Sequence, residues 1–306
     1  MEKYRKFADP GTGINVFLPR HLTQPRRESR LSVCLRVGLY YPLSVIRILL
    51  VLAAFLLIAI SDLLNYVPIL SFVLVRSALR PLLCWVALLL MGVVLPFGLS
   101  VEDFRRLKMR RPSEAAEGAG VVLTDFHGFI DILVHAVVTR PTCFVFRRLA
   151  GGHLVAWSVM GALRLWGEFG SKCLGSVSPV PEGALIFVWS VPTNGLGVLR
   201  LSMDWLSQVV SGRRCQMHVI NYSSRNFGVE HLVGSPVSHA MNLMTHNWYS
   251  SAQVMRLPEP ITDLSLARSY FSRMHPGCLE TDLEEADYLK FYSYWVETQS
   301  YKKKSK

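Results

Sequence analysis

The segment Gly120–Val138, GVVLTDFHGFIDILVHAVV, consists of a short apolar run, a polar turn and a longer apolar run. Its first part, Gly120–Leu123, is short and rich in β-branched residues, which predicts a strand. Its last part, Phe129–Val138, has the length and spacing of an amphipathic helix. A strand that leads directly into a helix is the repeating unit of an α/β domain, so this segment predicts that fold class.

The same alternation continues towards the C-terminus. We predict further strands over Thr142–Phe146, Ala184–Trp189, Gln216–Tyr222 and Gln253–Leu257, and further helices over Gly152–Leu165, Met203–Val210, Asp263–Met274 and Leu283–Tyr301. Together these elements predict an α/β domain over residues 105–280, with a mixed sheet flanked by helices. Residues 281–306 form a C-terminal helix and a basic tail, and the aromatic residues of that helix recur at the spacing of a packing face.

A hydrophobic block, Val37–Val101, precedes this domain. Within it, Ile48–Ser61 and Pro81–Val101 carry no charge, and only the second run has the length of about 20 residues that a membrane span needs. The first run reaches that length only if Arg47 lies at an interface. We therefore predict a basic N-terminal arm over residues 1–36 and a membrane-embedded helical hairpin over residues 37–104. The alternative is that Pro81–Val101 is a core helix of the soluble domain.

The net charge of +11 is concentrated in basic clusters on both sides of the hydrophobic block and in the tail. Basic residues on both flanks predict that both face the cytosol. Beside a hydrophobic block, anionic lipid headgroups are the expected partner of such charge, and the chain has no basic-aromatic module typical of nucleic-acid binding. The six cysteines are dispersed without a Cys-x-x-Cys pair, which favours reduced, buried thiols over a zinc site or a disulfide framework.

Two polar residues, His127 and Asp131, directly follow the first strand of the domain, where sites of α/β proteins gather. At a spacing of four they share one face of a helix. A neutral imidazole can take a proton from an attacking hydroxyl while a carboxylate orients the ring, so we predict His127 as a general base and Asp131 as its partner. The alternative is a capping or surface pair. The other histidines, His275 among them, show no metal-ligand spacing and are predicted to be structural.

A hydrophobic N-terminal region, a basic collar and then strand–His–Asp–helix together resemble the glycerolipid (lysophospholipid) acyltransferase superfamily, whose first motif is Asn-His-x-x-x-x-Asp. Here the stretch reads Thr-Asp-Phe-His-Gly-Phe-Ile-Asp over residues 124–131. If Asp131 is matched to the motif, the family histidine falls on Phe126, and His127 lies one residue out of register. The family's third motif, Phe-Pro-Glu-Gly-Thr, aligns with Val188–Pro192, where the glutamate is absent.

Other segments extend this resemblance over most of the chain. Met1–Pro19 and Thr193–Ser202 are similar to the corresponding parts of fungal and animal groups of the superfamily, and Met217–Asn221 and Leu257–Ile261 are similar to its late strand and Pro-Ile segments. The resemblance implies an acyltransferase-like fold, placed on the endoplasmic reticulum membrane or on lipid droplets with its soluble domain in the cytosol.

The resemblance also implies an activity: transfer of a fatty acyl group from acyl-CoA to a lysophospholipid, with lysophosphatidic acid as the first candidate. Acyl-CoA would be a co-substrate, and neither a cofactor nor a metal is expected. His127 and Asp131 would be catalytic, and backbone amides near Gly128 would stabilise the oxyanion. The residues expected to bind substrate or its phosphate are Gly128, Arg147, Arg148, Thr193, Asn194, Gly195 and Arg200.

A second function remains open at this stage, because two specific motifs are altered. The protein would keep the fold and the hairpin but act without catalysis, as a lipid-binding or recruitment module on the same membranes. Loss of the motif histidine and glutamate favours this hypothesis, whereas the retained Asp131 and the neighbouring His127 favour the enzyme.

Overall fold

The computed structural model describes residues 2–20, 41–64, 78–95, 102–103, 120–148, 152–167, 180–210, 212–224, 228–246, 249–257, 259–261 and 263–304. Residues 21–36 of the predicted arm, residues 65–77 of the hydrophobic block and the basic cluster that follows the block lie outside these residues. The helices are η1 (Glu2–Phe7), α3 (Tyr41–Leu64), α4 (Arg80–Leu90), α5 (Phe129–Val138), α6 (Val159–Gly167), α7 (Met203–Val210), α8 (Pro236–His246), η5 (Leu264–Leu266), α9 (Ala267–Met274) and α10 (Glu285–Lys304).

The strands form one large mixed sheet and one small sheet. The strands are β1 (Val93–Val94), β2 (Glu102–Asp103), β3 (Val121–Thr124), β4 (Phe144–Arg147), β5 (His153–Ala156), β6 (Ala184–Phe187), β7 (Gly197–Val198), β8 (Cys215–Ser224), β9 (Ser250–Arg256) and β10 (Leu279–Glu280). The large sheet has the order β1-β9-β8-β3-β6-β4-β5, and β2 also pairs with β9. Strands β8, β3, β6 and β4 run parallel, whereas β9 and β5 run antiparallel to their neighbours β8 and β4. The α/β class with a mixed sheet is therefore confirmed.

Alternate residues of the central strands enter two separate hydrophobic cores. On β3, Val121 and Leu123 belong to one core and Val122 to the other. On β6, Ile186 and Phe187 divide in the same way. Because successive side chains of a strand point to opposite faces, a sheet that is buried on both sides reads as a continuous apolar run rather than an alternating one.

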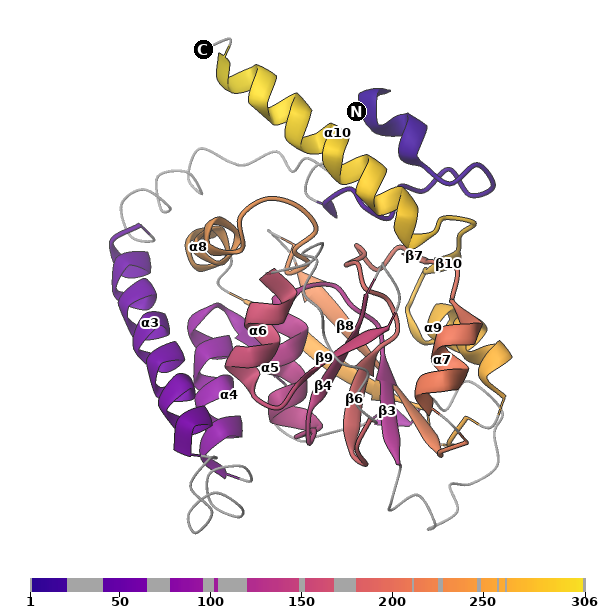
Figure 1. Cartoon of the computed structure of the whole chain (residues 1–306). Coiled ribbons are helices and arrows are strands. Elements are labelled where there is room, and N and C mark those ends of the chain that lie inside the picture. The colour runs from indigo at the N-terminus through magenta and orange to yellow at the C-terminus, as the bar shows by residue number, and fades with distance from the viewer. Residues whose placement is uncertain are drawn as a thin grey trace.

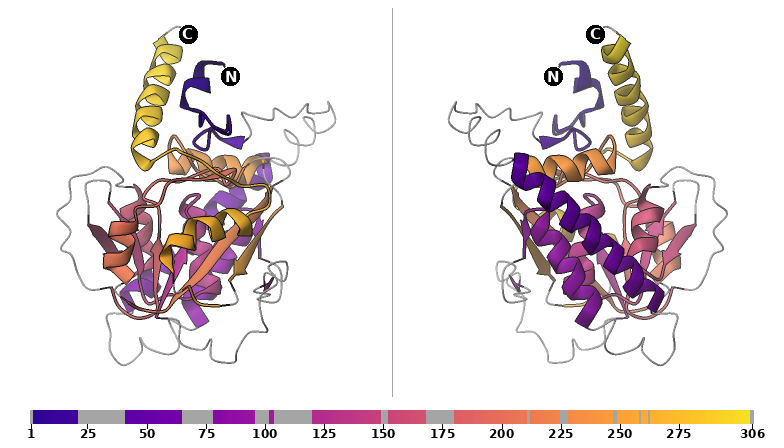
Figure 2. Two further views of the ribbon diagram at one scale, coloured as in Figure 1. Left: turned by 90° about the vertical axis from the view of Figure 1, so that its right-hand side faces the viewer. Right: turned by 90° about the vertical axis from the view of Figure 1, so that its left-hand side faces the viewer.

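Each face of the sheet has its own layer of helices (Figures 1 and 2). Helices α3, α4, α5 and α6 supply the core on one face, and α7, α9 and the N-terminal segment around Phe17 supply the core on the other. Helix α10 extends beyond the domain beside η1, and Tyr4 stacks on Trp295 with ring centroids 5.4 Å apart. The predicted aromatic packing face of α10 is confirmed for Phe291, which is fully buried.

Many elements lie where the sequence places them, but some differ. The segment Gly152–Leu165 was predicted as a helix, but its first part forms β5, which pairs antiparallel with β4. Gly152 has a φ of +78°, which lets the chain turn back on β4, and α6 begins only at Val159. A short apolar run is compatible with strand or helix, and here pairing with β4 decides between them.

The apolar run Pro81–Val101 does not form a long helix. Helix α4 ends at Leu90 and is followed by β1, which pairs with β9 of the main sheet. Cys84, Ala87 and Leu88 of α4 are fully buried, and the helix lies between α3 and α5. The alternative interpretation of this run, a core helix of the α/β domain, therefore describes residues 80–90, and β1 follows it.

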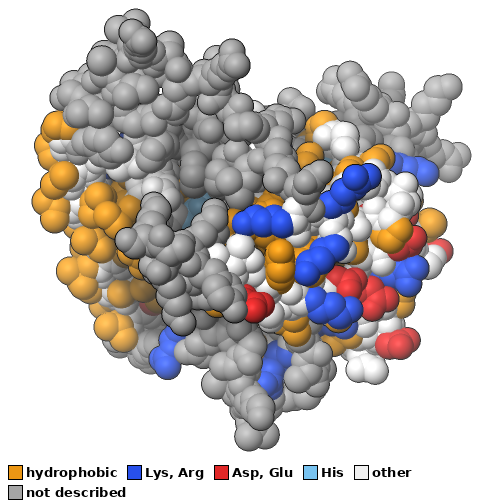
Figure 3. Space-filling view, turned by 90° about the horizontal axis from the view of Figure 1, so that it is seen from above, with side chains coloured by type: hydrophobic (Ala, Val, Ile, Leu, Met, Phe, Trp, Pro, Cys, Tyr) orange, Lys and Arg blue, Asp and Glu red, His pale blue; other side chains and the backbone are white. Residues whose placement is uncertain are grey.

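Helix α3 has two different faces. One face is buried against the domain and includes Val51, Ala54 and Ile58. The opposite face is apolar and exposed; its side chains are Val45, Ile46, Leu49, Leu50, Leu52, Leu56, Leu57, Ile60, Leu63 and Leu64. Among the described residues, only Pro42–Leu64 of this helix is long and apolar enough to cross a membrane, with a mean hydropathy of 2.9. Hydrophobic side chains gather on the flank of the molecule where α3 lies (Figure 3).

Polar contacts attach the inner face of α3 to the domain. Arg47 donates hydrogen bonds to the carbonyl oxygens of Leu90 and Met244, each at 2.8 Å, at the C-terminal ends of α4 and α8. At the other end of α3, Asp62 forms an ion pair of 3.0 Å with Arg80 and accepts a hydrogen bond of 2.9 Å from the backbone nitrogen of Met160. A cation at helix C-termini also interacts favourably with the helix dipole. Arg47 is thus bound to protein carbonyls on the inner face of the helix.

Candidate functional site: a buried His–Asp–His cluster

The candidate site lies at the carboxyl ends of the parallel strands β3 and β6. The turn Asp125–Gly128 follows β3, and the loop that contains Thr193 follows β6. His275, the residue that ends α9, reaches the same place from the other layer of helices. Parallel strands bring their carboxyl ends to one edge of a sheet, where α/β proteins place their ligands.

Both ring nitrogens of His127 are occupied. Its Nε2 lies 2.8 Å from Oδ2 of Asp125, and its Nδ1 lies 2.9 Å from the carbonyl oxygen of Thr193. The same Oδ2 of Asp125 also contacts Nε2 of His275. The carboxylate that contacts the His127 ring is therefore Asp125, whereas the sequence had suggested Asp131 for that role.

Asp131 instead caps the turn and the first part of α5. Its Oδ2 accepts hydrogen bonds from the backbone nitrogens of His127 at 2.5 Å and of Gly128 at 3.1 Å, and its Oδ1 accepts one from the Tyr222 hydroxyl. Backbone amides at the start of a helix have no partner within the helix. A carboxylate three or four residues further along the chain lies close enough to accept hydrogen bonds from them. The amides of His127 and Gly128, expected to stabilise an oxyanion, are thus occupied by Asp131.

Charge and burial shift the pKa values of the cluster in opposite directions. Burial acts to lower the pKa of His127, but the charge of Asp125 and its contact with the ring outweigh burial and raise that pKa to about 9. Burial likewise acts to raise the pKa of Asp125, yet His127 and His275 hold it well below its usual range. Asp131 differs, because burial prevails there and raises its pKa to about 6. At neutral pH His127 therefore favours its protonated form.

The segment Thr193–Gly195, predicted to bind substrate, borders His127, and the contacts of its side chains in this structure are structural. The fully buried Asn194 side chain donates to the carbonyl oxygens of Asn15 and Leu18, each at 3.0 Å. Gly195 has a φ of +69°, and a Cβ there would lie 2.8 Å from Arg20 and 3.3 Å from the His127 ring. The segment therefore packs the N-terminal chain against the cluster and leaves no space for a larger residue at position 195.

The arginines expected to hold phosphate are engaged elsewhere. Arg147 forms an ion pair of 2.5 Å with Glu285, and the guanidinium of Arg200 contacts Asp282 at 3.1 Å and Glu284 at 3.5 Å. Arg148 is half-buried just after β4. Among the described residues, no hydrogen bond or ion pair joins any of these three arginines to His127.

Sequence reasoning missed three residues of the cluster. Asp125 stands two residues before His127 and was overlooked because a strand-end aspartate is common. Tyr222 lies in β8 and His275 follows α9, so nothing in their local sequence marks them. Arg20, whose Nε lies 2.7 Å from the Asn194 carbonyl oxygen and 3.3 Å from Glu230, is the arginine that borders the cluster.

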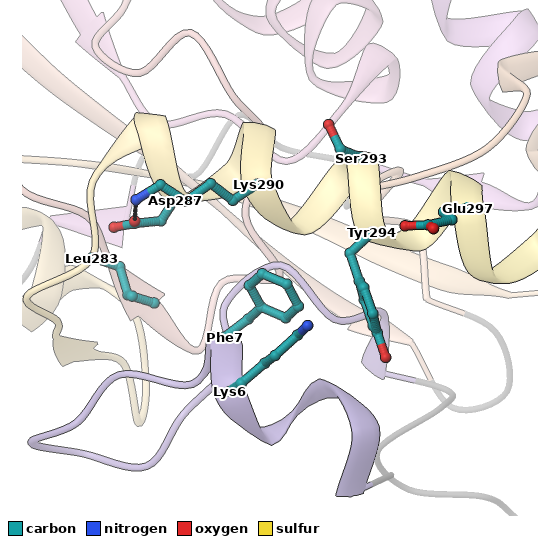
Figure 4. A pocket seen from close by; sticks show the side chains of 8 residues that line it. All are labelled: Lys6, Phe7, Leu283, Asp287, Lys290, Ser293, Tyr294 and Glu297. Atoms are coloured by element: carbon teal, nitrogen blue, oxygen red, sulfur yellow. Dashed lines mark hydrogen bonds and ion pairs between the residues drawn. The ribbon is translucent and has the colours of Figure 1, made fainter.

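An open groove of ≈ 540 Å³ lies between η1 and α10 (Figure 4). None of its lining residues belongs to the His127 cluster. Its cations already have partners, because Lys6 lies over the ring of Tyr294 at 3.7 Å and Lys290 contacts Asp287 at 3.0 Å. This groove therefore shows no set of unpaired charges that would select a ligand.

Comparison of the chain with protein-family models, with curated proteins and with solved structures found no match.

Proposed function

We propose that the protein docks on a lipid surface through the outer face of α3 and that its α/β domain acts there without catalysis, as a lipid-binding or recruitment module. The observation that carries this proposal is an apolar helix whose inner face is held on the domain while its outer face has no protein partner among the described residues. This proposal narrows the expected membrane-embedded hairpin to α3 alone, since α4 is in the core.

The arrangement of α3 favours a helix that lies along the membrane surface. Arg47, on its inner face, donates to carbonyl oxygens of α4 and α8, and Asp62 contacts Arg80 of α4 and the Met160 amide of α6. Both charges have these partners only while α3 stays on the domain. Moving such a helix across a bilayer would break these contacts and place both charges near the ends of the span, where each costs less than the roughly 2.5–3.5 kcal/mol of a charge at its centre. The inner face also packs Val51, Ala54 and Ile58 into the core of the domain, so both its apolar and its charged contacts hold α3 on the domain while the outer face is left for one leaflet.

The state of His127 favours a role without catalysis. A general base needs a lone pair directed at the substrate hydroxyl and a pKa near the working pH. Both nitrogens of His127 face atoms that only accept hydrogen bonds, and its pKa is raised to about 9. In this arrangement the ring has no lone pair to offer.

Vesicle flotation tests the membrane role. Leu49, Leu52 and Leu56 are 63%, 61% and 63% exposed. Full burial of a leucine contributes about 1.5–3 kcal/mol, so transfer of each exposed part into lipid contributes about 1 kcal/mol. Replacing all three by serine is expected to weaken binding to phosphatidylcholine–phosphatidylserine vesicles about 100-fold.

The matched control is the pair Leu289→Ser and Val296→Ser, which removes exposed apolar side chains from α10. The control is expected to bind vesicles as the wild type does. Equal binding by the α3 triple variant and the wild type would show that α3 does not hold the membrane.

The second candidate is the acyl-CoA-dependent lysophospholipid acyltransferase, which the buried His–Asp pair at a strand end supports. An assay with labelled acyl-CoA and a panel of lysophospholipids separates the two candidates. We expect no transfer above background from folded protein. Transfer that disappears in His127→Ala would reverse the order of the candidates.

A further inference from the structure

Three buried side chains from distant parts of the sequence converge on one point. Asp125 and His127 are each 3% exposed and His275 is 7% exposed. One ligand atom of each, Oδ2 of Asp125 and Nε2 of both histidines, lies within 4.8 Å of the other two. Two imidazoles and a carboxylate are a donor set that divalent transition metals bind well.

The outer nitrogens of both rings face hydrogen-bond acceptors. Nδ1 of His127 lies 2.9 Å from the Thr193 carbonyl oxygen, and Nδ1 of His275 lies 2.7 Å from Oδ1 of Asn221. The Asn221 amide is oriented by its Nδ2 group, which lies 3.3 Å from the Met274 carbonyl oxygen. Exchanging the oxygen and nitrogen of the Asn221 amide would place its Oδ1 against the Met274 carbonyl oxygen, and two acceptors would then face each other. Both rings therefore carry their proton on Nδ1 when they are neutral.

With this proton assignment, the cluster lacks a hydrogen-bond donor at its centre. Neutral rings with Nδ1–H direct both Nε2 lone pairs at Oδ2 of Asp125, so three acceptors face one another. Positive charge must lie between them, as extra protons on the rings or as a metal cation. A proton on His127 alone supplies one donor and still leaves Nε2 of His275 facing Oδ2 of Asp125. Two buried imidazolium rings with centroids 5.3 Å apart would repel each other, whereas one metal cation satisfies all three acceptors.

We propose that Asp125, His127 and His275 bind one divalent transition-metal ion of the Zn²⁺ class through Oδ2 and the two Nε2 atoms. The Thr193 carbonyl and Asn221 Oδ1 supply the outer hydrogen bonds that fix the tautomer of metal-binding histidines. Ligand atoms about 2.0–2.1 Å from zinc stand about 3.3 Å apart, so the contacts of Asp125 Oδ2 with both Nε2 atoms must lengthen on binding, that with His275 the more.

The site has three protein ligands, so a fourth position is left for water, and the burial of all three favours a role in stability. Its ligands join the turn after β3 to the C-terminal end of α9, two segments that pack on different parts of the sheet. A metal there cross-links them in the folded state only, and its binding free energy adds to the stability of the fold. It also occupies the Nε2 lone pair of His127. The inference does not depend on the membrane role of α3.

The test uses the full chain without a histidine tag. Metal content is measured by mass spectrometry after loading with Zn²⁺ and dialysis, and Co²⁺ is used as a spectroscopic probe for its visible absorption with nitrogen and oxygen ligands. We expect about one metal per chain, and a lower melting temperature after treatment with a chelator. The variants Asp125→Asn and His275→Gln are expected to lose the bound metal and the Co²⁺ spectrum.

The matched control is His218→Gln, which removes a buried histidine outside the cluster and should keep full metal content. Far-UV circular dichroism checks that each variant is folded. If Asp125→Asn does not fold, His275→Gln, which keeps a side chain of similar volume, still tests the proposal. Absence of metal from folded wild-type protein after loading would overturn the proposal. Equal metal content in the wild type and in both cluster variants would overturn it as well.

Discussion

The ion pair between Asp62 and Arg80 is the contact that most directly tests whether α3 stays on the domain. Both side chains are 7% exposed, and their charged atoms are 3.0 Å apart. At an effective dielectric constant of about 20, unit charges at this distance attract by about 5 kcal/mol, much of which offsets their desolvation. Removing one partner leaves the other charge buried and unpaired, which costs about 3–5 kcal/mol.

We therefore expect Asp62→Ala to lower the free energy of unfolding by about 3–5 kcal/mol. This variant also removes the acceptor of the Met160 amide. The double variant Asp62→Leu with Arg80→Met replaces the pair by apolar groups and should lose less stability than the sum of the two single changes. Urea unfolding in mild detergent, followed by far-UV circular dichroism, measures the stability of the wild type, of Asp62→Leu, of Arg80→Met and of the double variant.

The result that would refute this reasoning is additivity of the two substitutions, together with a loss below about 1 kcal/mol for each. That outcome would mean that the two charges do not meet in the folded protein. Helix α3 would then be free to leave the domain and cross the bilayer, and the surface-docking proposal would fall with it.

Three further predictions concern other contacts. Arg47→Leu removes two charged hydrogen bonds, each contributing about 1.5–3 kcal/mol, and should speed amide exchange in α8 by hydrogen-exchange mass spectrometry, whereas unchanged exchange would disprove the anchoring role. Burial lowers the pKa values of His135 to about 3 and His218 to about 4, from 6.5. Because the folded state resists protonation, their contribution is fully present above about pH 6.5 and is lost on acidification, by about 2 kcal/mol for each at pH 5. Urea unfolding at pH 7.5 and pH 5 measures this loss, and His218→Gln should reduce the pH dependence by about 2 kcal/mol; an unchanged dependence would contradict the assignment. Gly128→Ala should cost about 1–3 kcal/mol, since φ is +152° and a Cβ would lie 3.0 Å from the His231 nitrogen. Gly212→Ala shares a positive φ of +74° but has open space around it, so in thermal unfolding it controls for backbone strain and should cost less. Equal effects of the two alanines would contradict the predicted contact.

Local sequence patterns determined the elements of the domain. Val121–Thr124 and Ala184–Phe187 are continuous apolar runs because both faces of the sheet are covered, and Met203–Val210 forms a helix over the predicted range. The apolar run Pro81–Val101 was predicted to be part of a membrane-embedded hairpin, but its helix α4 lies in the core of the domain. A segment that is buried inside a protein and a segment that is buried in lipid have the same composition, and only packing against α3 and α5 distinguishes them.

The candidate site shows the same division. The sequence by itself determined that a histidine and carboxylates follow a strand and precede a helix, since strand, turn and helix propensities are local. Only the tertiary structure decided which carboxylate contacts His127, because that depends on the direction of the turn and on His275, which is 148 residues away in the chain. Charge and coordination depend on distances between side chains, and a linear pattern fixes those distances only within a single element of secondary structure.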